Sequence, residues 1–90
     1  MQTRVGVRYL GRVQGVGFRA TARATASGFR VSGWVRNEPD GSVLMEVQGD
    51  AAQVEVFLSA LAERMARNIK SVQRTALAVS EGESSFEIRR

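Results

Sequence analysis

The residues of this 90-residue chain that are best suited to chemistry lie in the segment GRVQGVGFR, residues 11–19. Three glycines fall within seven residues, and Arg12 and Arg19 flank the last two of them, Gly15 and Gly17. Glycine permits positive φ angles and lets the backbone come close to a ligand. Successive backbone N–H groups can then curl around an anion, and an arginine can bind the same anion with two hydrogen bonds. This combination predicts a phosphate-binding loop.

The loop lies between a predicted strand, residues 3–10, and a predicted helix, residues 19–28. A helix N-terminus adds unsatisfied N–H groups and the positive end of the helix dipole. A cation is unfavourable at that position, so an anionic ligand explains Arg19 better than helix stability does. The alternative is a plain turn whose glycines only set its geometry. The loop has neither the Lys-Ser/Thr ending of a Walker loop nor the G-x-G-x-x-G pattern of a dinucleotide site.

The composition narrows the chemistry that is open to this protein. Histidine and cysteine are absent, which removes the commonest general base, the commonest metal ligand and any thiolate nucleophile. Thirteen basic residues, twelve of them arginine, oppose nine acidic ones. The resulting net charge of +4 suits an anionic metabolite, nucleic acid or simple solubility. No signal peptide or membrane-length apolar run is present, so the simplest expectation is a cytoplasmic protein, the alternative being a secreted protein without cysteine. A zinc site built from carboxylates alone would be unusual, so we expect no metal and no cofactor.

The hydrophobic pattern along the chain alternates between strand and helix periods. Strands are expected over residues 3–10, 31–37, 42–49, 71–79 and 86–90, and helices over 19–28, closed by Gly28, and after the capping residue Asp50. Five apolar residues of the second helix recur at helical spacing and are expected in the core: Val54, Phe57, Leu58, Leu61 and Met65. A turn at 38–42 joins two strands into a hairpin, and residues 80–85 form an exposed acidic loop.

This order predicts an α+β fold, the ferredoxin-like βαββαβ sandwich, over a single domain of residues 1–90. A mainly antiparallel sheet would carry two helices on one face and a short extra strand at the C-terminus. Trp34 is expected to pack, and Arg12 and Arg36 to be solvated.

Two segments together resemble a known family. GRVQGVGFR followed by GWVRNEPDG is similar to the two signatures of the acylphosphatases, a G-x-V-Q-G-V-x-F-R loop and a G-W-V-x-N strand. The similarity extends over nearly all 90 residues, including the D-G turn, Gly49 and the closing FEI. The family has the ferredoxin-like fold that the hydrophobic periods predict independently.

The resemblance implies metal-free hydrolysis of acyl phosphates, small-molecule substrates, to a carboxylate and phosphate. The family's phosphate-binding arginine falls on Arg19, and its water-orienting asparagine falls on Asn37. The implied phosphate cradle consists of the backbone N–H groups of Gln14, Gly15, Val16, Gly17 and Phe18. Nothing in the sequence identifies a residue that would recognise the acyl end of the substrate.

Some features depart from the family pattern, and three other functions are compatible with the fold. Arg30 stands where the family usually has glycine, and residues 66–71 lack the usual Gly-Pro character.

A nucleic-acid-binding module would need exposed aromatic residues, but the chain has only six aromatics. An anion-sensing domain without turnover is a second alternative. The third is a domain of a larger carbamoyl-phosphate-handling protein, whose cysteine-containing zinc segments are not found here. We expect a monomer with no nucleic-acid or membrane partner.

Overall fold

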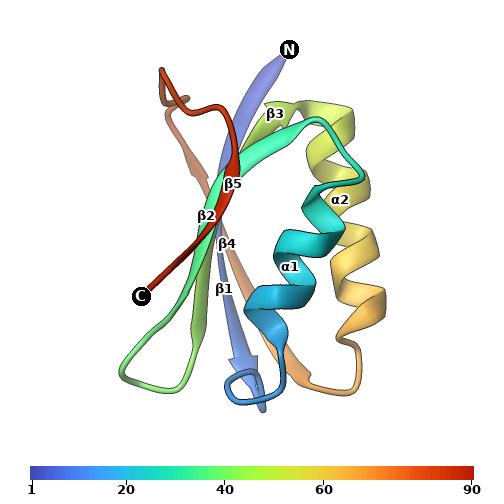
Figure 1. The fold of residues 1–90 in the computed structure, drawn as a ribbon, viewed down its shortest axis with the longest axis vertical. Helices are drawn as coiled ribbons and strands as arrows, with labels where there is room; N and C mark the ends of the chain where they lie inside the picture. Colours follow the sequence, from blue (N-terminus) through green and yellow to red (C-terminus); the bar gives the residue numbers. More distant parts are fainter.

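The computed structural model describes all residues 1–90 and contains five strands and two helices. In chain order these are β1 (Gln2–Gly11), α1 (Phe18–Ala26), β2 (Val31–Asn37), β3 (Val43–Asp50), α2 (Ala51–Arg64), β4 (Ile69–Leu77) and β5 (Phe86–Arg89). The strands form one sheet in the order β4-β1-β3-β2-β5. All neighbours are antiparallel except β2 and β5, which are parallel. The predicted ferredoxin-like arrangement with an extra C-terminal strand is confirmed (Figure 1).

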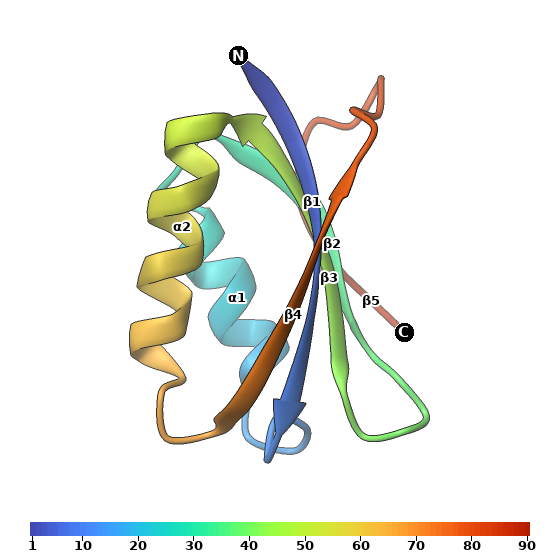
Figure 2. The same ribbon diagram turned by 180° about the vertical axis from the view of Figure 1, so that it is seen from behind.

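Both helices cover the same face of the sheet, and the other face carries no helix (Figure 2). Strand residues alternate between the two faces, so every second residue of β1 and β3 enters the core. Fifteen buried apolar residues form one cluster between the layers: Val5, Val7, Tyr9, Val13, Phe18, Ala22, Ala26, Val35, Val43, Met45, Val47, Val54, Phe57, Leu61 and Met65. Leu58, also expected in the core, packs against this cluster while partly exposed. Neither helix has the length and apolarity that crossing a membrane would require.

Some predicted boundaries need correction. The first helix begins one residue earlier than expected, at Phe18, and ends at Ala26. Gly28 does not close it in a left-handed conformation, because Ser27 caps the helix with φ −62° and Gly28 has no positive φ. The fourth strand begins at Ile69 instead of residue 71, beside a register shift at Gly11.

The loop at 80–85 is tied to the open face of the sheet. The expected exposure is wrong for Glu83, whose carboxylate accepts hydrogen bonds of 2.9 and 3.2 Å from the Arg4 guanidinium. Arg4 lies on the open face of β1, yet only 6% of its surface is exposed. Gln48 of β3 adds two hydrogen bonds to the backbone of Ser80. These contacts hold the connection that leads into β5.

Candidate phosphate-binding and catalytic site

The loop between β1 and α1 turns sharply at two glycines. Gly15 has φ +74° and Gly17 has φ +79°, in the left-handed region that side chains with a Cβ rarely adopt. A Cβ added to either residue would meet no atom within 4 Å. Backbone conformation, not crowding, therefore requires glycine at both positions, and the space in front of the loop stays open.

The N–H groups along this loop are free to bind a ligand. None of the backbone N–H groups of residues 14–17 donates a hydrogen bond within the chain. The next three, from Phe18 to Ala20, lie in the first turn of α1 and have no intrahelical acceptor. No side chain caps this helix end, and its first turn contains no acidic residue. The result is a run of unsatisfied donors at the positive end of a helix dipole.

Buried apolar side chains anchor the loop at both ends. Val13 and Phe18 are 1% and 2% exposed, and the Phe18 ring lies 4.8 Å from that of Tyr9, centroid to centroid. Burial raises the pKa of the Tyr9 hydroxyl, with a smaller opposing effect of Arg74, so the ring stays neutral in ordinary buffers. The base of the loop is therefore apolar and uncharged, and its free donors lie above a rigid support.

Gln14 connects the loop to the hairpin between β2 and β3. Its side-chain Nε2 donates to the backbone oxygens of Glu38, at 2.7 Å, and Ser42, at 2.8 Å. Glu38 directly follows Asn37, the last residue of β2. Gln14 thus fixes the distance between the loop and the strand end that carries Asn37.

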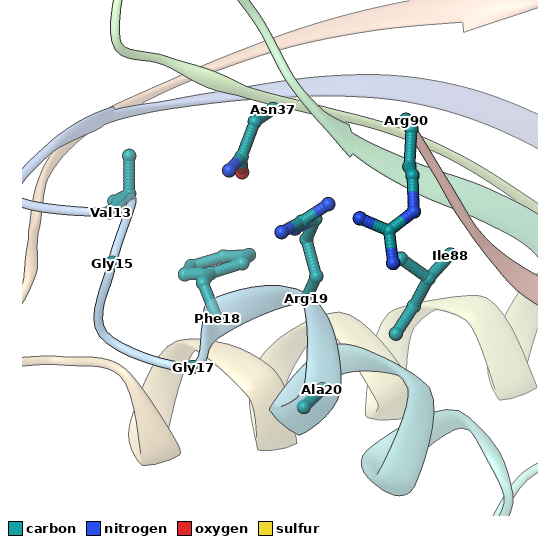
Figure 3. A pocket seen from close by; sticks show the side chains of 9 residues that line it. All are labelled: Val13, Gly15, Gly17, Phe18, Arg19, Ala20, Asn37, Ile88 and Arg90. Atoms are coloured by element: carbon teal, nitrogen blue, oxygen red, sulfur yellow. The ribbon is translucent and has the colours of Figure 1, made fainter.

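These elements enclose a cavity of about 240 Å³ in front of the loop. Nine residues line it: Val13, Gly15, Gly17, Phe18, Arg19, Ala20, Asn37, Ile88 and Arg90. Figure 3 shows Arg19 rising from α1 and Asn37 descending from the sheet into the same space. No acidic residue lines the cavity, and neither Arg19 nor Arg90 forms an ion pair. An anion is therefore the ligand that this cavity suits best.

The Asn37 side chain is unusual because it leaves a buried polar atom without a hydrogen bond. Its Oδ1 is buried and is the one buried side-chain polar atom in the structure without a hydrogen-bond partner. Buried polar atoms are nearly always paired, and an exception at a cavity marks an amide that the protein leaves free for a ligand or a water molecule. Glu38, the neighbouring acid, is bound to the Arg36 guanidinium at 2.8 Å, outside the set of cavity-lining residues.

The structure brings together most of the residues expected at the site. Gly15, Gly17, Phe18, Arg19 and Asn37 all line the cavity. Val16 is exposed at the loop tip, and neither it nor Gln14 is among the lining residues.

Sequence reasoning missed two residues of β5 and its end, Ile88 and Arg90. The signal that could have found them is strand pairing, because β5 runs parallel to β2 and ends beside Asn37. No pattern within the motif loop itself points to β5.

The other residues named in the sequence analysis, Trp34, Arg36 and Arg12, lie outside the cavity lining. Trp34 is buried on the open face of the sheet, and the guanidinium groups of Arg36 and Arg89 each lie 4.9 Å from its ring centroid. Packing, as expected, accounts for it, whereas Arg36 is engaged by both Trp34 and Glu38 instead of being freely solvated. Arg12 is exposed. No group of three or more acidic, cysteine or histidine side chains is placed to hold a metal ion.

Comparisons with known proteins agree on one family. The family model described as acylphosphatase matches residues 5–88. The chain is 41% identical over 91 residues to an acylphosphatase of Salinibacter ruber, covering 99% of this chain and 95% of that protein. It is 45% identical over 80 residues to an acylphosphatase of Thiobacillus denitrificans, covering 88% of each. The crystal structure of an acylphosphatase from Bacillus subtilis superimposes with a TM-score of 0.86 at 27% identity, covering both chains completely.

Proposed function

The chain belongs to the acylphosphatase family and is a hydrolase of acyl phosphates, and we propose that its glycine loop and Arg19 bind the phosphoryl group while Asn37 orients the attacking water. The observation that carries the proposal is the joint lining of one cavity by the free loop donors, an unpaired Arg19 and the unpartnered Asn37 amide. Each of the three supplies one requirement of phosphoryl transfer.

The loop and Arg19 stabilise the negative charge of the phosphoryl group. The phosphoryl group carries its charge on three equatorial oxygens, and catalysis consists mostly of positioning and neutralising them. The N–H groups around Gly15 and Gly17 and the first turn of α1 bind two or more of these oxygens. The Arg19 fork binds the remaining one, and it needs no rearrangement because no carboxylate competes for it.

Asn37 positions the attacking water. An amide oxygen accepts a hydrogen bond from water and so aims the water lone pair at phosphorus, opposite the leaving acyl oxygen. The water oxygen forms the new P–O bond as the bond from phosphorus to the acyl oxygen breaks, and the bonding electrons leave on the carboxylate. An amide is too weak a base to take the water proton, so a phosphoryl oxygen of the substrate accepts it. This route needs no histidine, and the chain has none.

The test measures phosphate release from benzoyl phosphate, with a metal chelator present, by the wild type, Arg19→Ala and Asn37→Ala. Removing one preorganised donor from such a site typically lowers the rate about 100- to 1,000-fold. We expect a loss of this size for each variant, with unchanged thermal unfolding, and full wild-type activity in the chelator.

Two matched variants serve as controls. Arg12→Ala removes an exposed arginine that adjoins the loop but does not line the cavity, and Asn68→Ala removes the other asparagine of the chain. Both should retain wild-type turnover within about threefold, the scale of a surface substitution. Equal losses in Arg12→Ala and Arg19→Ala would show that general positive charge, and not a specific contact, supports the reaction. Loss of activity in the chelator would refute the metal-free route.

A further inference from the structure

A second cation enters the cavity from the sheet, at Arg90. In the parallel pair, Val35 lies opposite Ile88 and Arg36 opposite Arg89, so the chain after β5 runs beside Asn37. Ile88 packs against the core on the helix-covered side, whereas Arg89 lies over Trp34 on the open face. Arg90 follows Ile88 by two residues and so falls on the helix-covered side with it. The Arg90 side chain lines the cavity accordingly (Figure 3).

The cavity thus has two chemically distinct ends. One end consists of loop donors and Arg19, which the proposed mechanism occupies with the phosphoryl group. The other consists of Ile88, an apolar side chain, and Arg90, a guanidinium without an ion-pair partner. In the in-line displacement the acyl group lies on the side of phosphorus away from the water that Asn37 holds, so it extends toward Ile88 and Arg90 or out to solvent.

Arg90 is held near the cavity by more than the strand pairing. Arg4, Ser32 and Gln48 bind the loop that precedes β5, through Glu83 and Ser80. Arg89, the preceding residue, stacks on Trp34. The chain up to Arg89 is therefore held by both the preceding loop and the open face of the sheet, which places Arg90 beside the cavity.

We propose that Arg90 selects acyl phosphates whose acyl group carries a second anionic group, a carboxylate or a phosphate, at the end away from the phosphoryl group. The inference rests on the proposed function, since it assumes that the phosphoryl group occupies the loop. A guanidinium is suited to either anion because its fork matches their paired oxygens. Ile88 contacts the carbon skeleton between the two charged ends. Arg90 is thereby a specificity-determining residue and not part of the phosphoryl-transfer machinery.

The experiment compares substrates that differ only in this charge. The wild type and Arg90→Gln are assayed for kcat and KM with benzoyl phosphate and with 3- and 4-carboxybenzoyl phosphate, the two isomers sampling two distances to Arg90. The measured quantity is the ratio of kcat/KM for a carboxylated substrate to that for benzoyl phosphate. An exposed ion pair contributes at most about a fivefold effect in most cases. We therefore expect Arg90→Gln to lower the ratio about fivefold for at least one isomer, mainly through KM, and to leave kcat/KM for benzoyl phosphate within about twofold.

The control is Arg23→Gln, which removes the same charge from an exposed position on α1 that does not line the cavity. It should leave the ratio unchanged. Raising the salt concentration should shrink the wild-type ratio toward that of Arg90→Gln, because screening weakens an exposed pair.

Three results would overturn the inference. A ratio that is the same in Arg90→Gln and the wild type for both isomers shows that Arg90 does not contact the acyl end. An equal fall in Arg23→Gln shows diffuse attraction instead of a contact. An equal fall of kcat/KM for all three substrates in Arg90→Gln assigns Arg90 to the phosphoryl end. The proposed function fails separately, if the folded wild type hydrolyses none of the three substrates.

Discussion

Replacing Gln14 by methionine tests whether the tie between the loop and the β2–β3 hairpin sets the geometry of the site. Methionine preserves the length and unbranched shape of the side chain but has no N–H to donate. The substitution therefore removes the 2.7 Å bond to the Glu38 oxygen and the 2.8 Å bond to the Ser42 oxygen with little change in volume.

The effect on stability depends on which hydrogen bonds the Glu38 and Ser42 carbonyl oxygens keep after the substitution. A typical hydrogen bond contributes about 0.5–1.5 kcal/mol net, and stranding a buried partner costs more. Neither carbonyl is stranded here, because the Glu38 oxygen also accepts from Gly41 N and the Ser42 oxygen from Glu38 N. We therefore expect a loss of about 1–2 kcal/mol in the free energy of unfolding. For a domain of this size that is about 5–15 °C in the melting temperature.

The cost to activity should exceed what stability alone implies. Without the tie, the loop donors and Asn37 can drift apart while the protein stays folded. Misplacement of reacting groups by about 1 Å can cost about 100-fold in rate, so we expect kcat/KM for benzoyl phosphate to fall about 10- to 100-fold. The assay pairs urea denaturation with steady-state kinetics at a temperature well below the melting point of the variant.

Gln53→Met is the matched control for Gln14→Met. Gln53 accepts one hydrogen bond from the Arg30 backbone at 3.0 Å and lies outside the cavity-lining residues. It should lose some stability but no activity. If Gln14→Met loses the expected stability yet keeps wild-type kcat/KM, the tie is only structural and the reasoning that links it to catalysis is wrong.

Two further predictions concern stability. Gly17→Ala should lower the free energy of unfolding, measured by urea denaturation, by about 1–2 kcal/mol, because only the left-handed backbone opposes the new side chain. Gly33→Ala should abolish cooperative unfolding, because the new Cβ would lie 2.0 Å from the Glu46 carbonyl oxygen. Burial opposes ionisation of Glu83, but hydrogen bonds from Arg4 and Ser32 hold its pKa below the ordinary 4.5. The stabilisation from ionised Glu83 should be complete above about pH 4.5 and lost as pH falls through the lowered pKa. Glu83→Gln should therefore make the free energy of unfolding less dependent on pH on the acid side, as measured by denaturation between about pH 2 and 6.

The glycine-loop end of the cavity could be predicted because short-range chain geometry determines it. The two left-handed glycines, the start of α1 and the arginine that follows lie within six residues, from Gly15 to Ala20, so their relative positions depend on local conformation. Asn37 could be added through its strand pattern and the family resemblance. The core helix was equally accessible, since Val54, Phe57 and Leu61 lie on one face at helical spacing.

The main features that the sequence did not reveal depend on pairing between distant segments, and one further miss is local. Arg4 is an ordinary outward residue of a strand pattern until Glu83 is placed against it, 79 positions away. The end of α1 was also misjudged, because Ser27 completes the last turn with a right-handed conformation and leaves Gly28 without the expected role. The first of these depends on a contact 79 positions away, whereas the second is local, since the N–H groups of Ser27 and Gly28 bond to carbonyls of the last helical turn.

The two ends of the cavity therefore have different structural origins, and this difference bears on how the enzyme can change. The proposed phosphoryl end is formed by the segment from Gly15 to Ala20 and by Asn37, so we expect substitutions there to alter charge stabilisation and rate together. The proposed acyl end is formed by Ile88 and Arg90, at a strand that β2 and the Arg4–Glu83 pair hold in place, away from the loop. Substitutions at the acyl end can then change substrate preference while leaving the phosphoryl-transfer geometry intact. This is why Arg90→Gln should alter the preference between substrates while Arg19→Ala should slow all of them.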